Sequence, residues 1–273
     1  YGSITRRALS EELPRAAPHR YLYNLLADYP RRGGKMMRSS LCIATARAFG
    51  ARLDEALRCA VAIELIHNAM LIHDDIEDGS LERRGSPALH ITHGMPLALN
   101  AGDTLTLMSL KPLIDNRNIV GPRIAARVLE ETMVMARETA EGQAMELGWC
   151  RENVTHLDDT DYLAMVCKKT CWLATIYPMR VGALIGTRGC IDLEPFVRCG
   201  FFVGAAFQIQ DDLLNLSADR RYGKELDGDI WEGKRTLMMI RLFRVAGADE
   251  RGRLERILGR SRSERTIEDV RWI

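Results

Sequence analysis

The chain has 273 residues, of which 47% are hydrophobic, enough to build a sizeable core. Its 38 Lys and Arg residues almost balance its 37 Asp and Glu residues, and a net charge of +1 argues against a nucleic-acid partner. Charged residues interrupt each apolar run, which argues against stable membrane insertion. The seven cysteines contain no CxxC pair, a pattern that favours reduced thiols and a cytoplasmic location.

Apolar residues recur with helical spacing along most of the chain, and no segment sustains the alternation of a β-strand. The polar turns between these segments are short, so no linker divides the chain. We therefore predict an all-α protein in which residues 1–273 form a single domain. The main predicted helices cover residues 40–49, 51–73, 97–114, 124–147, 162–185 and 201–216.

An acidic cluster, Asp74-Asp75-Ile76-Glu77-Asp78, follows a mostly apolar helical run. On a helix Asp74 and Asp78 lie one turn apart on the same face. At roughly 6 Å and an effective dielectric of about 20, two carboxylates repel by about 3 kcal/mol. A bound cation would offset this cost, and all-oxygen ligands favour Mg²⁺, which completes its shell with water and phosphate. The alternative is an acidic helix end exposed to solvent.

Basic residues lie on both sides of this cluster. The segment Arg31–Arg38 places four cations around a glycine pair, just before a predicted helix, and is either an anion cradle or an exposed basic turn. Arg83 and Arg84 follow the cluster in a loop, and arginine binds phosphate through two parallel hydrogen bonds. His67, about two turns before Asp74, is aimed toward the same cluster.

A second acidic pair, Asp211-Asp212, lies near the end of another apolar helix, with Asn215 one turn beyond Asp211. The segment Lys168-Lys169-Thr170 lies within an apolar stretch, where a lysine needs an anionic partner. Two opposed carboxylate clusters can hold Mg²⁺ ions that clamp a diphosphate. Because the remaining lining is apolar, we expect the substrate tail to be a hydrocarbon.

With these motifs the sequence resembles the trans-isoprenyl diphosphate synthase family, which includes farnesyl and geranylgeranyl diphosphate synthases. The resemblance extends at least from Gly33 to Lys234. It implies an isoprenoid synthase-type helical bundle around a central apolar cavity, usually in a homodimer. The matching features are the GGKxxR turn at 33–38, the DDxxD motif at 74–78, Arg83-Arg84-Gly85, Lys169-Thr170, and Phe207-Gln208 before the second acidic pair.

The resemblance also implies an activity: a prenyltransferase that joins an allylic diphosphate to isopentenyl diphosphate by ionisation and condensation. About three Mg²⁺ ions would assist departure of the allylic diphosphate. The implied roles are metal binding by Asp74, Asp75, Asp78, Asp211 and Asp212; isopentenyl diphosphate binding by Lys35, Arg38, His67 and Arg84; contacts to the allylic diphosphate by Arg83, Lys169, Gln208 and Lys234; and support of the cation by Thr170.

Two positions depart from the family pattern. Asn215 stands where many members have aspartate, which keeps a carbonyl oxygen but removes one charge from the expected metal clamp. Trp172 follows Lys169-Thr170-Cys171 where small residues are common, and we expect it either to narrow the cavity or to change how the tail packs. Family members also continue beyond the position of Ile273, so we expect the C-terminal end to be incomplete.

Product length depends on what blocks the growing tail alongside the helix that carries Asp74. One isoprene unit is about as long as one helical turn, roughly 5 Å. Met70 and Ala69 lie four and five residues before Asp74, where farnesyl-type members often place an aromatic residue. We therefore predict a product longer than C15, geranylgeranyl diphosphate (C20), with Met70 or the turn at 105–108 as the floor.

Two other functions fit parts of the pattern. A terpene cyclase of the same fold also uses acidic Mg²⁺ motifs, but it needs no isopentenyl diphosphate pocket. A non-catalytic partner subunit of a prenyl synthase typically loses carboxylates from its acidic motifs, whereas this chain keeps five aspartates in them.

Overall fold

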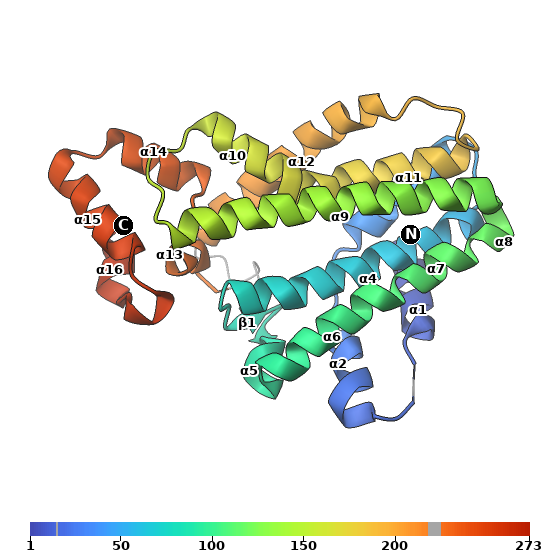
Figure 1. The fold of residues 1–273 in the computed structure, drawn as a ribbon, viewed down its shortest axis with the longest axis horizontal. Coiled ribbons are helices and arrows are strands. Elements are labelled where there is room, and N and C mark those ends of the chain that lie inside the picture. The colour runs from blue at the N-terminus through green and yellow to red at the C-terminus, as the bar shows by residue number, and fades with distance from the viewer. Residues whose placement is uncertain (15, 218–224) are drawn as a thin grey trace.

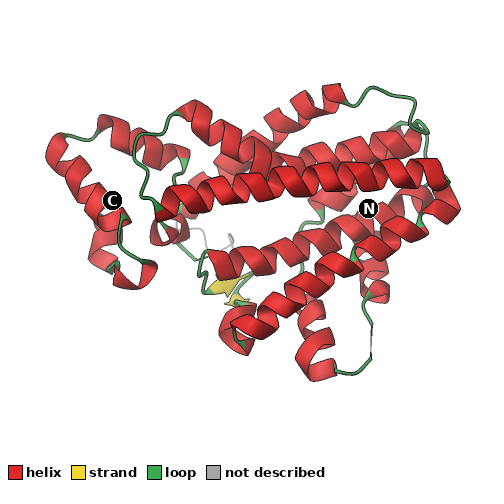
Figure 2. Ribbon diagram, viewed as in Figure 1, coloured by secondary structure: helices red, strands yellow, loops and turns green. Residues whose placement is uncertain are grey.

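The computed structural model describes residues 1–14, 16–217 and 225–273. Nearly all regular structure in these ranges is helical, which confirms the all-α prediction (Figure 1 and Figure 2). The helices are α1 (Gly2–Glu12), η1 (His19–Tyr23), α2 (Asn24–Arg31), α3 (Met37–Ala48), α4 (Leu53–Glu77), α5 (Leu89–His93), α6 (Met95–Met108), α7 (Leu110–Asp115), α8 (Arg117–Val120), α9 (Pro122–Arg151), α10 (Asp159–Val166), η2 (Cys167–Ile176), α11 (Tyr177–Gly186), α12 (Glu194–Asn215), α13 (Gly228–Glu232), α14 (Leu237–Val245), α15 (Ala248–Leu258), η4 (Arg262–Glu264) and α16 (Ile267–Trp272).

Helix α4 is the central element of the bundle. One side of it packs with α3, α9 and α11 around Ile43, Ile63 and Tyr177, and the other side packs with α1, α2 and α6 around Leu65 and Leu105. Full burial of such a side chain contributes about 1.5–3 kcal/mol. The helix continues four residues beyond the predicted end at 73, so most of the first acidic cluster is itself helical.

A third hydrophobic core joins α10, η2 and α12, and it contains Tyr162, Val166, Ile176 and Ala205. Helices α10, η2 and α11 follow one another without a break, and the η2 segment is wound as a wider π-helix. Such π-helical turns are often found at functional sites. Here the turn carries Lys169 and Thr170.

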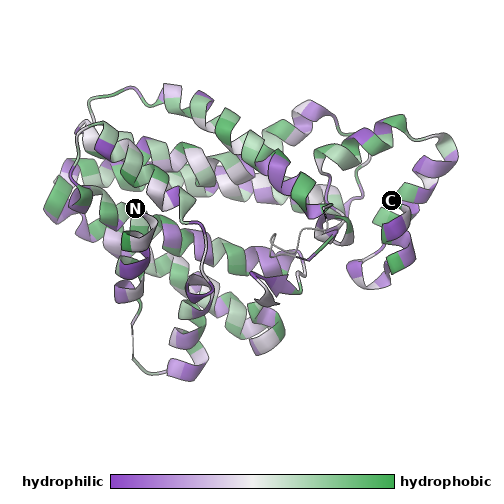
Figure 3. Cartoon of the chain, turned by 180° about the vertical axis from the view of Figure 1, so that it is seen from behind, coloured by the Kyte–Doolittle hydropathy of each residue, from purple (hydrophilic) through white to green (hydrophobic). Residues whose placement is uncertain are grey.

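The predicted helix 97–114 divides into α6 and α7 around Ser109. Pro112 has no backbone N–H to donate to the carbonyl of Met108, so the α6 ladder cannot continue through it. The chain also contains two strands of two residues each, β1 (Glu82–Arg83) and β2 (Ser86–Pro87). They form a tight antiparallel turn that is hydrophilic in Figure 3, in contrast to the long packed helices.

Helices α13 to α16 pack around their own small core at one end of the molecule, beyond the last turn of α9 (Figure 1). Within this end of the molecule, Arg262 forms ion pairs with Glu225 and with Glu232 of α13. Ser80, just after α4, donates a hydrogen bond to Glu232 across 2.8 Å.

One described helix, α4, bears on the expectation of no stable membrane insertion. In length and hydropathy α4 would suffice to cross a membrane. In this fold 67% of its most apolar window is buried among other helices, as in the core helix of a soluble protein.

Gly142 on α9 allows η2 to approach closely, which gives a test of this packing. A Cβ at position 142 would overlap the backbone of Lys169, whereas a Cβ at Gly148 on the same helix would meet open space. We predict that Gly142→Ala lowers the free energy of unfolding by about 1–3 kcal/mol. Gly148→Ala should raise it by about 0.5–1 kcal/mol, because alanine favours a helix. Urea unfolding followed by circular dichroism measures both, and equal effects would contradict the close approach.

Candidate active site

A cavity of about 820 Å³ lies between α3, α4, α9, η2 and α12. All predicted site residues line it except Asp75 and Ala69. The predicted residues that line the cavity are Lys35, Arg38, His67, Met70, Asp74, Asp78, Arg83, Arg84, Lys169, Thr170, Gln208, Asp211, Asp212 and Lys234.

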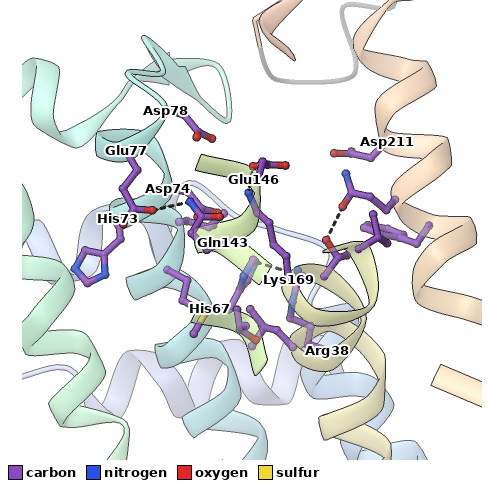
Figure 4. Close-up of a pocket in the computed structure, with 18 of the residues that line it drawn as sticks. Arg38, His67, His73, Asp74, Glu77, Asp78, Gln143, Glu146, Lys169 and Asp211 are labelled. Atoms are coloured by element: carbon purple, nitrogen blue, oxygen red, sulfur yellow. Dashed lines mark hydrogen bonds and ion pairs between the residues drawn. The ribbon is translucent and has the colours of Figure 1, made fainter. Parts of the chain in front are cut away.

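Acidic side chains face each other across the cavity. Asp74 and Asp78 come from α4, and Asp211 comes from α12 on the opposite wall (Figure 4). Burial raises the pKa of Asp74, and the nearby Asp78 charge acts in the same direction, although Lys169 opposes both. The pKa of Asp78 is lowered instead, because the charges of Lys234 and Lys169 outweigh the effect of its burial.

Two lysines partly neutralise this acidic cavity. Lys169 forms an ion pair with Glu146 on α9, and Lys234 pairs with Asp78 at 2.8 Å and with Glu232 at 2.7 Å. Burial alone would lower the pKa of each lysine, but the surrounding carboxylates overcome this effect and raise it. Both lysines are therefore cations at neutral pH.

Asp75 does not face the cavity, contrary to its predicted role as a metal ligand. Its side chain is fully buried and accepts hydrogen bonds from Tyr29 and Arg83. The helix turns by about 100° per residue, so Asp75 points toward α2 while Asp74 points into the cavity. The charge of Asp75 overcomes the burial of Arg83 and raises the pKa of that guanidinium.

Asp212 lines the cavity, but both of its carboxylate oxygens accept protein hydrogen bonds. Tyr162 donates to one oxygen and Gln208 to the other, each across 2.7 Å. Gln208 in turn accepts a hydrogen bond from Thr170 across 2.8 Å. Thr170 and Gln208, which were predicted separately as site residues, are therefore in direct contact.

The two departures from the family pattern lie away from the cavity lining. The side-chain oxygen of Asn215 accepts a hydrogen bond from the backbone N–H of Asp229, so it connects α12 to α13 and is not directed at a metal. Trp172 packs between two hydrophobic cores and lies near the guanidinium of Arg180, so it does not narrow the cavity.

A second group of basic residues lies at another side of the cavity, away from the two lysines. Arg38 and His67 lie below the carboxylates in Figure 4, with 3.4 Å between Arg38 Nη1 and His67 Nε2. Gly34, with φ of +149°, leaves room for Arg84, whose guanidinium would meet a Cβ there. Burial lowers the pKa of His67, and the charges of Arg38 and Arg84 lower it further, so its imidazole is neutral at pH 7.

The two predicted chain-length residues separate. Met70 lines the cavity, whereas Ala69 is fully buried in the core between α4 and α6. Leu105, in the turn proposed as an alternative floor, lies in the same core and does not line the cavity. Leu173 and Phe207 are among the other apolar residues of the lining.

Sequence reasoning assigned no role to several residues that hold the site together. Glu146 and Glu232 pair with the two lysines, Gln143 donates to Glu77 across 2.6 Å, and Tyr29 and Tyr162 bind the second aspartate of each acidic motif. The only signal for Glu146 was the rule that a buried lysine needs a partner. No pattern in the sequence indicated the tyrosines.

The carboxylates around the cavity are too far apart to complete the coordination shell of a metal ion by themselves. Among the residues that the structure describes, no three His, Cys, Asp or Glu side chains converge as a preformed metal cluster. Mg²⁺ commonly binds one or two carboxylates and fills its remaining positions with water and phosphate oxygens. Asp74, Asp78 and Asp211, which offer only oxygen ligands, fit that requirement.

Comparison with known proteins gives a consistent result. The family model for polyprenyl synthetase matches residues 19–272. A short chain isoprenyl diphosphate synthase of Methanothermobacter thermautotrophicus is 37% identical over 231 residues, covering 83% of this chain and 68% of that protein.

Solved structures share the fold over nearly the whole chain. The geranylgeranyl pyrophosphate synthetase of Pyrococcus horikoshii superposes with a TM-score of 0.84 at 34% identity, covering 99% of this chain and 80% of that one. A polyprenyl synthase of Caulobacter crescentus, crystallised with calcium and isoprenyl diphosphate, superposes with a TM-score of 0.85 at 29% identity, covering 99% and 78% of the two chains.

The buried neutral His67 predicts how stability depends on pH. On unfolding, its pKa returns to about 6.5, so the unfolded chain binds a proton that the folded chain does not. Its contribution to stability is therefore complete above about pH 6.5 and is lost as the pH falls below that value, by about 1 kcal/mol down to pH 5.5. In urea unfolding, the free energy of unfolding of His67→Gln should fall by about 1 kcal/mol less than that of the wild type between about pH 6.5 and pH 5.5. His93→Gln, which changes an exposed imidazole, is the control, and equal pH dependence in all three proteins would contradict this reading.

Proposed function

Because this chain belongs to the polyprenyl synthetase family, we infer that it is a trans-prenyltransferase, which condenses an allylic diphosphate with isopentenyl diphosphate. The observation that carries this inference is one cavity that combines facing aspartates, a separate basic side and an apolar lining. Such a cavity suits two diphosphates and a hydrocarbon tail. The synthases of known structure with which the chain shares its fold support geranylgeranyl diphosphate as the product.

In our proposal Asp74, Asp78 and Asp211 would hold Mg²⁺, which would neutralise negative charge on the departing diphosphate. Arg83, Lys169 and Lys234 supply fixed positive charge on the same side of the cavity. Their charge is already in place before the reaction, so no reorganisation is needed as negative charge develops on the diphosphate. Asp212 acts through Gln208, and Asp75 acts through Arg83. The number of metal ions, about three, is carried over from the family resemblance.

The second substrate, isopentenyl diphosphate, would bind at the basic side formed by Lys35, Arg38, His67 and Arg84. A neutral His67 can still donate one hydrogen bond to an anion. The double bond of this substrate then attacks the allylic carbocation, and the intermediate loses a proton to the released diphosphate. Thr170 stabilises the cation with its hydroxyl oxygen, Gln208 completes the site of the allylic diphosphate, and the apolar lining excludes water that would otherwise quench the cation.

A terpene cyclase does not bind isopentenyl diphosphate, so it would not need the basic side of this cavity. A non-catalytic subunit would not need Asp74, Asp78 and Asp211 around one cavity. Both alternatives therefore explain less of the site than a synthase does.

We further propose that the protein is a cytoplasmic homodimer. Exposed apolar side chains lie along α6, α7 and α9, and they include Leu99, Leu107, Ile114 and Met133. A second copy would cover these residues. All seven cysteines have free thiols, in keeping with a reducing compartment.

The activity is tested by incubating the protein with Mg²⁺, isopentenyl diphosphate and each allylic diphosphate in turn. We predict that Asp74→Ala and Asp211→Ala each reduce kcat by about 10³-fold, because each removes charge that holds the leaving group. Helical circular dichroism should not change. Glu194→Ala, an exposed substitution at the other end of α12, should retain activity. Full activity in both aspartate variants, or cyclic products from the wild type, would refute the proposal.

Product length is tested at Met70. We predict that Met70→Phe shortens the main product from C20 to C15, because the larger ring fills the cavity by about one helical turn. Met70→Ala should lengthen it. Chromatography of the dephosphorylated products measures both. Ala69→Phe is the matched comparison, since its side chain would enter the packed core and should lower stability by about 1–3 kcal/mol without adding a wall to the cavity.

A further inference from the structure

Each acidic motif has one aspartate whose carboxylate is held by a buried tyrosine from another helix. Tyr29 on α2 donates to Asp75, and Tyr162 on α10 donates to Asp212. Tyr29 has 0% exposure and Tyr162 has 1%, so neither hydroxyl exchanges its partner with bulk water. The two contacts come from separate parts of the chain and occupy the same position in each motif.

Tyr29 connects the first acidic motif to the arginine turn. Its hydroxyl donates to Asp75 and accepts a hydrogen bond from the backbone N–H of Leu89 across 3.1 Å. The other oxygen of Asp75 accepts hydrogen bonds from Arg83, and the backbone carbonyl of Tyr29 accepts one from Arg84 across 2.8 Å. Both arginines line the cavity. The position of Tyr29 therefore affects the positions of both Arg83 and Arg84.

Tyr162 has the equivalent position on the opposite wall. Its hydroxyl donates to one oxygen of Asp212, while the other oxygen accepts from Gln208. Gln208 then presents its side-chain oxygen to Thr170. Without the tyrosine hydroxyl, one oxygen of Asp212 would lose its partner, and the carboxylate that Gln208 contacts would no longer be held in one orientation.

We propose that Tyr29 and Tyr162 are positioning residues, which hold Asp75 and Asp212 so that these two aspartates orient Arg83 and Gln208 toward the diphosphate. This inference rests on the proposed function. Hydrogen bonds to a carboxylate are stronger than neutral ones, and a buried one fixes the acceptor in a single orientation. The arrangement resembles the outer partners that orient ligands in metal sites. In each motif the second aspartate, Asp75 or Asp212, accepts hydrogen bonds from a buried tyrosine and from a polar side chain that lines the cavity.

A third buried tyrosine provides a matched control. Tyr177 has 0% exposure, and its hydroxyl hydrogen-bonds to Thr132 across 2.7 Å in the core between α9 and α11. It does not line the cavity. Phenylalanine at each of the three positions removes one buried hydroxyl and keeps the ring.

The test measures two quantities for Tyr29→Phe, Tyr162→Phe and Tyr177→Phe. The first is binding of inorganic diphosphate with Mg²⁺ by isothermal titration calorimetry, which needs no turnover. The second is kcat and KM for each substrate. We expect the first two variants to bind diphosphate about 10- to 100-fold more weakly, the effect of a lost hydrogen bond to a charged group. Tyr29→Phe should raise KM for the allylic substrate, whereas Tyr162→Phe should mainly lower kcat.

Tyr177→Phe should bind diphosphate within about twofold of the wild type, even where its melting temperature falls as much as that of the other variants. Equal diphosphate binding in all three variants would overturn the inference, and so would losses that follow only the melting temperature. A wild type that binds diphosphate but transfers no prenyl group would refute the proposed function and not the positioning role. An active wild type with tyrosine variants that match the control would refute the positioning role alone.

Discussion

Negative charge held inside a buried cavity is the constraint on which the rest of this structure depends. Asp74 and Asp78 face Asp211 where burial disfavours ionised carboxylates, as the raised pKa of Asp74 shows. The surrounding side chains reduce the free-energy cost of burying these carboxylates. Lys169 and Lys234 bring compensating charge, Arg83 neutralises Asp75, and Tyr162 with Gln208 satisfies Asp212. Helices α4, α9, η2 and α12 are arranged so that these side chains meet.

The helical fold and most cavity residues could be predicted from the sequence, because both depend on local patterns. Apolar spacing indicates helices wherever a core helix such as α4 needs a continuous buried face. The acidic motifs and the glycine turn are short and distinctive. Burial on all sides of α4, however, made its length ambiguous, and a single proline was enough to divide α6 from α7.

The expectations for individual side chains that the structure does not support share one cause, which is that a sequence motif does not specify the direction in which each side chain points. Asp75 and Ala69 are adjacent in sequence to residues that line the cavity, yet each points into a core. Asn215 and Trp172 stand at motif positions but contact α13 and two hydrophobic cores. Partners far apart in the chain, such as Tyr29 with Asp75 or Lys169 with Glu146, arise only when the helices pack.

The ion pairs of Lys169 with Glu146 and of Lys234 with Glu232 have a consequence for the order of loading. Before any substrate arrives, ammonium groups already act as counterions to the aspartates. A lone divalent ion would have to compete with them, and it would gain little for the water it gives up. A diphosphate that carries its own magnesium arrives with enough anionic oxygen to take over these ammonium groups. In the proposed mechanism, metal occupancy would thereby be coupled to the arrival of the substrate.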